Sequence, residues 1–293
     1  MSKNVWNLLA VLLTATALSA CSKPNDGPST ESSSYLSIKG SDTMVHLVSD
    51  WAEAYMKDNP DADLSVTGGG SGTGIAALLN GTTDIAMASR SMKQKEHDLA
   101  EKQGMEIEEI VVARDGIAMV VNPANSVNEL TIKQLGDIFA GKTTNWSEVG
   151  GPDESIALLS RESSSGTYVF VQKRVLGKRD YASSARLMPA TSGVIQAVTT
   201  EKGSIGYVGL GYLTGAGDQV RAIAVKDGDA GDPIAPTVES VKSGSYAIAR
   251  PLHLYMKKNG SQSVRDFVKF CLGPDGQHIV SEAGYVPVEN GAK

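Results

Sequence analysis

The chain has 293 residues, an ordinary globular composition and a formal net charge of −6 at pH 7. No basic stripe is present to neutralise a phosphodiester backbone, so the composition argues against nucleic-acid binding. A small anion is not excluded, because donors gathered in a cleft can outweigh the field of the whole molecule.

The N-terminus carries a targeting pattern. A short cationic start precedes an apolar run over 5–17, which is shorter than the roughly 20 residues of a membrane-spanning helix and suits a signal peptide over 1–20. Leu18-Ser19-Ala20-Cys21 resembles the lipobox of bacterial lipoproteins, and this resemblance implies a lipid on Cys21. The alternative is a core helix with a chance cysteine. Residues 21–34 lack large apolar side chains and are expected to form a lipidated, flexible tether.

Strands and helices alternate in the first part of the folded chain. Met44, Val48 and Trp51 share one helical face and predict a helix over 43–57. The other predicted elements are strands at 36–39, 64–67, 84–88, 110–113 and 117–122 and helices at 73–79 and 96–104.

A second unit follows and the same alternation continues. Its predicted helices are 131–139, 167–176, 193–199 and 264–272, and its predicted strands are 156–159, 205–208, 220–225 and 251–256. The alternation indicates an α/β fold with largely parallel sheets. We expect two lobes, joined by crossing strands near 115–120 and 245–251, with a ligand cleft between them.

Three hydroxyl-rich turns precede predicted helices. Arg161 stands shortly before Ser165-Gly166-Thr167, and similar turns occur at Gly40-Ser41-Asp42-Thr43-Met44 and Gly70-Ser71-Gly72-Thr73-Gly74. A helix start offers free N–H groups and the positive end of the helix dipole. Hydroxyls add directed donors, and a guanidinium suits a tetrahedral oxyanion. The sequence therefore predicts one anion held from several sides.

Catalytic chemistry is not supported by these motifs. The segment 68–74 lacks the lysine of a P-loop, and Ser165 lacks the Gly-x-Ser-x-Gly elbow of a hydrolase. The four histidines form no His-x-x-x-His metal pair. We therefore predict no enzyme activity, no catalytic residue, no metal site and no cofactor. Cys271 would be the single cysteine of the mature fold, without a disulfide partner.

The order and spacing of the motifs resemble the phosphate-binding proteins of bacterial phosphate ABC importers, over nearly all of residues 36–288. The resemblance is carried by Gly40–Met44, Gly68–Gly74, Asp84–Arg90, Leu130-Thr131 with Ile138–Gly141, Asn145–Gly151, Arg161–Thr167 and Gly203–Tyr207. It implies the type II periplasmic-binding-protein fold, with a mixed sheet flanked by helices in each lobe. The implied boundaries are 35–118 and 249–293 for the first lobe and 119–248 for the second.

The resemblance also implies a function. The protein would be an extracytoplasmic, monomeric lipoprotein that captures inorganic phosphate and delivers it to the permease subunits of an ABC importer. Its contact with the membrane would be through the N-terminal lipid only. The implied phosphate ligands are Ser41, Thr43, Met44, Ser71, Ser89, Arg90, Arg161, Ser165, Gly166 and Thr167.

Two positions depart from the family pattern. Well-known members have an aspartate where this chain has Arg90, and another where it has Ser163. The first aspartate accepts the proton of protonated phosphate, so its absence predicts weaker rejection of sulfate; Asp42 is the candidate replacement. Two other functions stay open: a sensor or binding protein for another tetrahedral oxyanion such as sulfate, and a hydrolase of phosphate or sulfate esters.

Overall fold

The computed structural model describes residues 34–288. The predicted signal peptide, Cys21 and the tether up to residue 33 lie outside this range. None of the helices between residues 34 and 288 is both long and apolar enough to cross a membrane.

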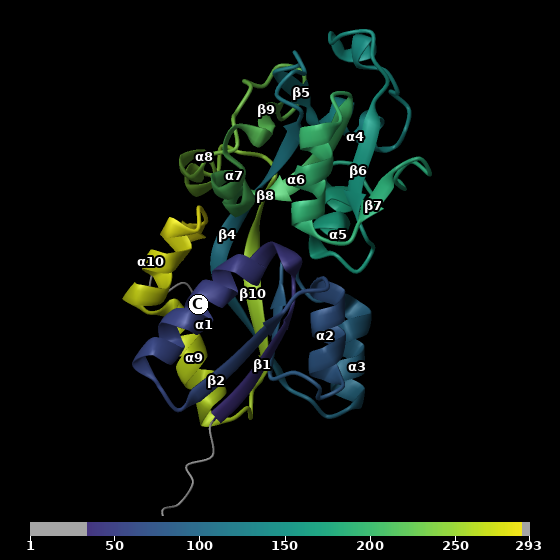
Figure 1. Ribbon diagram of the computed structural model, residues 1–293. Coiled ribbons are helices and arrows are strands. Elements are labelled where there is room, and N and C mark those ends of the chain that lie inside the picture. Colours follow the sequence, from purple (N-terminus) through teal and green to yellow (C-terminus); the bar gives the residue numbers. More distant parts are fainter. Residues whose placement is uncertain (1–33, 289–293) are drawn as a thin grey trace, which may run out of the picture. The chain divides into compact units, whose positions relative to one another are not determined.

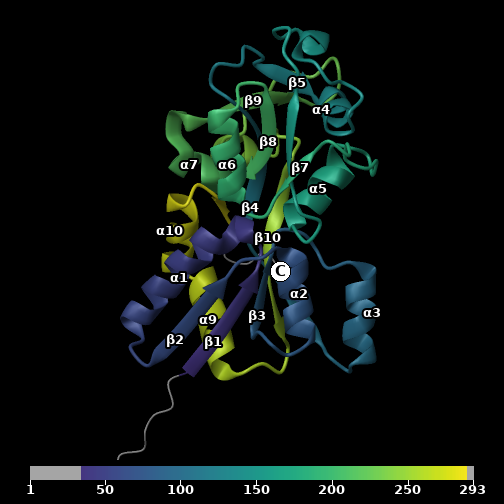
Figure 2. The ribbon, with the colours of Figure 1, turned by 45° about the vertical axis from the view of Figure 1, so that its right-hand side comes forward.

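The first lobe is built on three parallel strands, β1 (Ser34–Gly40), β2 (Ala62–Thr67) and β3 (Ile85–Ala88), with β1 in the middle. Helices α1 (Val45–Asp58) and α9 (Gln262–Leu272) cover one face, and α2 (Ser71–Leu79) and α3 (Gln94–Lys102) cover the other (Figures 1 and 2). Met44, Val48 and Trp51 are fully buried in the core under α1, as the helical periodicity predicted. Helix α10 (Pro274–Glu282) follows α9.

Two long antiparallel strands connect the lobes. β4 (Ile107–Val121) pairs with β10 (Ala249–Lys257). It continues to pair with β8 (Ser204–Gly209) and β9 (Arg221–Lys226) of the second lobe. The short strand β11 (Val286–Pro287) pairs with β4 as well. The prediction of two separate strands at 110–113 and 117–122 was therefore wrong, because one continuous strand spans both segments.

The second lobe surrounds another core, which contains Phe139, Trp146 and Tyr207. Its strands are β5 (Glu129–Thr131), β6 (Ala157–Arg161), β7 (Arg186–Met188), β8 (Ser204–Gly209) and β9 (Arg221–Lys226). Its helices are α4 (Ile132–Phe139), α5 (Gly166–Arg174), α6 (Thr191–Thr200), α7 (Leu210–Ala216) and α8 (Val238–Ser243). Short 3-10 turns occupy Asp42–Met44 (η1), Trp146–Val149 (η2) and Gly217–Gln219 (η3).

The predicted α/β class and the two-lobed architecture are confirmed, and the sheets are mixed. Parallel pairing holds within the lobes, for example between β6 and β8, whereas every pairing that β4 and β10 make is antiparallel. The expectation of largely parallel sheets therefore fails at the crossing strands, since these traverse the molecule in opposite directions. The short strands β5, β7 and β11 and the helices α7, α8 and α10 had no counterpart among the predicted elements.

Candidate anion-binding site

Three helix starts converge where the two lobes meet. The turn η1 and the start of α2 belong to the first lobe, and the start of α5 belongs to the second. Thr43 Oγ1 and Thr167 Oγ1 lie 2.9 Å apart across this junction. The Gly72 N–H donates to Ser164 O at 2.9 Å. The structure thus brings together the three hydroxyl-rich turns that the sequence singled out.

A buried set of hydroxyls, here called the hydroxyl cluster, consists of Ser41, Thr43, Ser71, Ser89 and Thr167. The Ser41 hydroxyl donates to Ser89 Oγ at 2.9 Å, and Ser71 Oγ lies 3.2 Å from the same oxygen. The Ser89 N–H donates to Ser71 Oγ at 3.0 Å. Every member is almost completely buried. Each hydroxyl can donate or accept by rotating, so the cluster can meet an oxyanion with several directed donors.

Gly166, the first residue of α5, allows this close approach. A Cβ placed on Gly166 would lie 2.4 Å from Ser71 Oγ and 2.6 Å from Ser89 Oγ, which is well inside contact distance. The preceding Ser165 caps the helix, because its Oγ accepts from the N–H groups of Thr167 and Tyr168. The amide end of α5 is therefore held directly against the hydroxyl cluster.

Arg250, which the sequence analysis missed, is the guanidinium that reaches the hydroxyl cluster. Its Nη2 donates to Thr167 Oγ1 at 2.9 Å and lies 3.5 Å from Thr43 Oγ1. Its Nη1 donates to Ser89 O at 2.9 Å. The residue stands on β10 in Ala249-Arg250-Pro251, away from every hydroxyl-rich turn. Only the register of β10 within the sheet carries it into the site.

Asp115 on β4 is the direct cross-strand partner of Arg250. Its Oδ2 accepts from Arg250 Nη2 at 3.0 Å and from Nε at 3.3 Å, while its Oδ1 accepts from the Leu210 N–H at 2.9 Å. Both side chains are buried. Burial raises the pKa of Asp115, and the positive charge of Arg250 opposes that rise. The pair fixes the guanidinium in place and neutralises much of its charge.

Arg161 lies at the end of β6, and its guanidinium is held by several protein acceptors. Nη1 donates to Thr191 Oγ1 at 2.6 Å, Nη2 to Pro189 O at 2.9 Å, and Nε to Met188 O at 3.2 Å. Nη2 also lies 3.4 Å from Asp42 Oδ2 of the first lobe. Arg161 therefore joins β6, the start of α6 and η1, beside the hydroxyl cluster.

Asp42, the candidate replacement for the missing family carboxylates, is already engaged. Its Oδ2 accepts from the Thr191 N–H at 2.6 Å in addition to its ion pair with Arg161. Asp42 of the first lobe is thus bound to Arg161 and Thr191 of the second lobe, and it links the two lobes.

Arg90 is nearly buried and forms a bidentate ion pair with Glu96 of α3. The two N–O distances are 2.8 and 2.7 Å. Burial alone would raise the pKa of Glu96, but hydrogen bonds from Arg90 and the Lys93 N–H bring that pKa below its usual value. Arg90 Nε is buried and has no partner among the described residues. The hydrogen bonds of Arg90 are thus with Glu96 of α3 and with Ser91 O just before that helix, while its Nη2 lies 3.5 Å from a Cβ placed on Gly72 in α2.

Met44 was predicted to offer its backbone N–H to the anion. In this structure that N–H donates to Ser41 O at 2.9 Å, and the side chain is buried in the first-lobe core. Within residues 34–288, no group of three or more His, Cys, Asp or Glu side chains is placed to hold a metal ion.

Comparison with known proteins gives the same architecture. The family model of the PBP superfamily domain matches residues 27–275. The phosphate-binding protein PstS of Staphylococcus epidermidis is 35% identical over 292 residues, covering 96% of this chain and 88% of that protein. PstS of Staphylococcus haemolyticus is 35% identical over 254 residues, covering 85% of this chain and 79% of that protein.

Solved structures agree with these relatives. A phosphate ABC transporter substrate-binding protein from Clostridium perfringens, with bound phosphate, superposes with a TM-score of 0.80 at 31% identity, covering 87% of this chain and 100% of that chain. An ABC-type phosphate transport receptor from Vibrio cholerae superposes with a TM-score of 0.69 at 29% identity, covering 86% of this chain and 100% of that chain. This chain therefore belongs to the PBP superfamily and, within it, to the family of PstS phosphate-binding proteins.

Proposed function

We propose that this protein binds inorganic phosphate between its two lobes and delivers it to an ABC importer. The observation that carries the proposal is the convergence of the hydroxyl cluster, the start of α5 and Arg250 on one buried point. Hydrogen bonds to a charged group contribute about 1.5–3 kcal/mol each, so a handful exceeds the ~8 kcal/mol of a micromolar complex. The excess offsets desolvation of the anion and closure of the lobes.

We assign the phosphate contacts to the ten residues predicted from the sequence and add Arg250. Ser41, Thr43, Ser71, Ser89, Gly166 and Thr167 have the strongest support, because their own contacts place them in or against one buried cluster. Ser165 would act through its hydroxyl, which accepts from the N–H groups of Thr167 and Tyr168 and can still donate its proton to the anion. Met44 would act through its backbone N–H, which would have to leave Ser41 O. Arg161 would act from beside the cluster, whereas Arg90 would need to exchange its Glu96 partner for the anion.

The arrangement of charge favours weak discrimination between phosphate and sulfate. Asp42 and Asp115, the carboxylates beside the site, each already accept hydrogen bonds from an arginine or a backbone N–H. The O–H of a protonated phosphate would then donate a hydrogen bond to a serine or threonine hydroxyl oxygen, and the same hydroxyl can turn and donate to sulfate. Selectivity among oxyanions would come from the shape of the site and its number of hydrogen-bond donors, more than from a carboxylate that accepts the phosphate O–H.

The remaining features of the proposal follow the family pattern. The protein would act as a non-enzymatic, extracytoplasmic monomer on the periplasmic side of a membrane or at the cell surface, held there by a lipid on Cys21. Lobe closure would report occupancy to the permease. The first lobe would comprise 35–118 and 249–293, and the second lobe 119–248. Two hydrophobic cores, each including residues of β4, support this division, although Ile117 and Val286 pack in the second-lobe core.

Calorimetric titration of the purified protein with phosphate, sulfate, arsenate and molybdate tests the proposal. We expect phosphate to bind at micromolar or lower concentration and a large excess of sulfate to reduce the apparent affinity. Ser89→Ala should weaken binding, whereas Ser204→Ala, an equally buried serine that donates to Glu201 O, should not. A protein that binds none of the four anions would contradict the proposed function, and phosphate binding untouched by sulfate would contradict the selectivity argument.

A further inference from the structure

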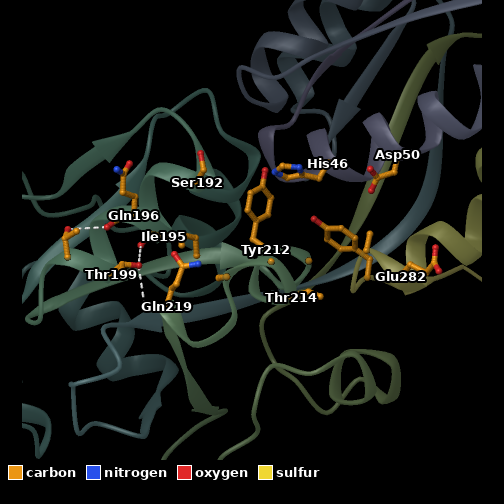
Figure 3. A pocket seen from close by; sticks show the side chains of 16 residues that line it. His46, Asp50, Ser192, Ile195, Gln196, Thr199, Tyr212, Thr214, Gln219 and Glu282 are labelled. Atoms are coloured by element: carbon orange, nitrogen blue, oxygen red, sulfur yellow. Dashed lines mark hydrogen bonds between the residues drawn. The ribbon is translucent and has the colours of Figure 1, made fainter.

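A hollow lies between the lobes, and no member of the hydroxyl cluster lines it. It has a volume of about 630 Å³, within the roughly 300–1,000 Å³ range of small-molecule sites. One wall comes from α1 and residues 282–285 of the first lobe, and the other comes from α6 and α7 of the second (Figure 3). We call this hollow the inter-lobe pocket.

The charged lining of the inter-lobe pocket is acidic. Asp50 and Glu282 line it, and none of its lining residues is lysine or arginine. Two histidines face these carboxylates: His46 lies one turn before Asp50 on α1, and His278 Nε2 lies 3.4 Å from Glu282 Oε1. An adjoining hollow shares Asp50 and Glu282 and adds Glu53 and Lys57. The balance of charge therefore favours a cation.

The rest of the lining suits an organic body. The Tyr212 ring packs edge-on against His46 with their centroids 5.0 Å apart, and Ile195 adds an aliphatic surface. Ser192 and Gln196 also line the pocket, and their side chains make no hydrogen bond to another described residue. An aromatic face next to carboxylates is the setting in which ammonium groups gain a cation–π contact.

Two tyrosines of the inter-lobe pocket bond directly to the anion site. Tyr212 Oη, from the second lobe, donates to Asp42 O at 2.7 Å. Tyr285 Oη, from the first lobe, donates to Thr43 O at 2.8 Å. These consecutive carbonyls belong to η1, the turn that carries Thr43 into the hydroxyl cluster. A ligand that moves either ring will therefore move a wall of the anion site.

We propose that the inter-lobe pocket binds a small organic ammonium ion and that its occupancy changes the affinity for the anion. The ammonium group contacts Asp50 and Glu282, and the organic body lies against Tyr212. The proposal that the inter-lobe pocket binds a cation does not depend on the proposed function. The proposed coupling between cation and anion binding rests on the proposed function. Coupling between two sites is reciprocal, so the anion changes the affinity for the ammonium ion by the same factor.

Thermal unfolding and calorimetry of the full chain in phosphate-free buffer test the pocket, with choline and benzylamine as cations and benzyl alcohol as the neutral match for benzylamine. We expect at least one cation to bind with a Kd of about 1 mM or tighter, and benzyl alcohol to have no effect. The double variant Asp50→Asn with Glu282→Gln should weaken that binding at least tenfold. Asp58→Asn, also on α1 but outside the pocket, should leave it unchanged.

A second variant, Gly215→Leu, fills the inter-lobe pocket without changing a charged residue. Gly215 lies in α7 and lines the pocket, and no atom lies within 4 Å of a Cβ placed on it. Gly215→Leu should abolish cation binding while keeping or raising the melting temperature, because leucine favours a helix more than glycine does. The pocket assignment is overturned if neither cation binds, if benzyl alcohol matches benzylamine, or if binding survives in Gly215→Leu.

The coupling has its own readout. Phosphate titrations with and without saturating cation should give affinities that differ by about fivefold or more. If the two phosphate affinities agree, the coupling is wrong and the pocket assignment stands. If phosphate fails to bind in either titration, the proposed function fails and the cation titrations still decide the pocket.

Discussion

Arg250 of the crossing strand β10 and Thr167 of the second lobe meet through a 2.9 Å hydrogen bond from guanidinium Nη2 to hydroxyl Oγ1. Thr167 lies in the first turn of α5, whereas Arg250 stands on a crossing strand and is anchored by Asp115. A buried cation held in this way is ready to meet an anion without rearrangement of its own side chain. Its position suggests that the crossing strands contribute a ligand as well as a connection.

Replacing Arg250 by glutamine should weaken phosphate binding more than tenfold, equivalent to more than about 1.4 kcal/mol. The substitution removes a buried charge-assisted donor that hydroxyls cannot replace. Calorimetric titration measures the change, and Arg179→Gln, which breaks a partly exposed ion pair with Asp137, is the matched control. An affinity equal to that of the control variant would remove Arg250 from the site.

The Asp115–Arg250 pair should affect stability and binding in separable ways. Asp115→Leu alone leaves a buried arginine unpaired and should lower the free energy of unfolding by about 3–5 kcal/mol. Adding Arg250→Met should recover much of that loss, because an apolar pair replaces an ion pair with little net cost. Urea denaturation gives the stability, and phosphate titration should show that the double variant remains defective. A double variant with normal affinity would contradict the assignment of Arg250.

Arg161→Ala should reduce phosphate affinity at least tenfold, although its guanidinium is also bound to Thr191 and Pro189 O. Loss of the side chain removes the Asp42 ion pair, which holds η1 of the first lobe near β6 of the second. Comparison with Asp42→Asn separates the two roles. If Asp42→Asn reproduces the full loss, Arg161 acts by positioning η1, and if it does not, Arg161 acts on the anion itself. A change below tenfold for Arg161→Ala would show that it does neither.

Gly166→Ala should weaken phosphate binding because the added methyl group would push α5 away from Ser71 and Ser89. The free energy of unfolding should fall by about 1–3 kcal/mol, because the added methyl group overpacks a buried contact. Binding and thermal unfolding are measured together. Gly193→Ala is the control: Gly193 lies in the first turn of α6 and its Cβ would be in ordinary contact with the Met188 side chain at 3.4 Å, so we expect normal affinity. Tight binding by Gly166→Ala would show that the close approach of α5 is dispensable.

The Arg90–Glu96 pair predicts a dependence of stability on pH. The pKa of Glu96 lies below its usual 4.5 in the folded protein, so the folded state binds fewer protons than the unfolded state as the pH falls. The stabilisation is complete above the unfolded pKa and is lost as the pH drops through the folded one. Wild type should therefore exceed Glu96→Gln in unfolding free energy near pH 7 and match it in strong acid. A difference between wild type and Glu96→Gln that stays constant with pH would contradict this role.

The sequence by itself was enough to place the hydroxyl-rich turns before their helices and to predict the α/β alternation. These signals are local: a capping serine such as Ser165 acts on N–H groups two or three residues away. The buried face of α1 was also predicted from the sequence, because Val48 and Trp51 recur with the period of a single helix. The ion pair between Arg90 and Glu96 is also local, yet it was not predicted, because Arg90 was assigned to the anion.

Tertiary structure alone decided which cation reaches the anion site. Arg250 and Asp115 are 135 residues apart and become partners through the antiparallel register of β10 and β4. A shift of one residue in that register would send the guanidinium to the opposite face of the sheet. No local pattern records such a pairing, because strand register depends on long-range contacts. For the same reason the sequence offered two arginines near the hydroxyl-rich turns, while the fold brought a third into direct contact with them.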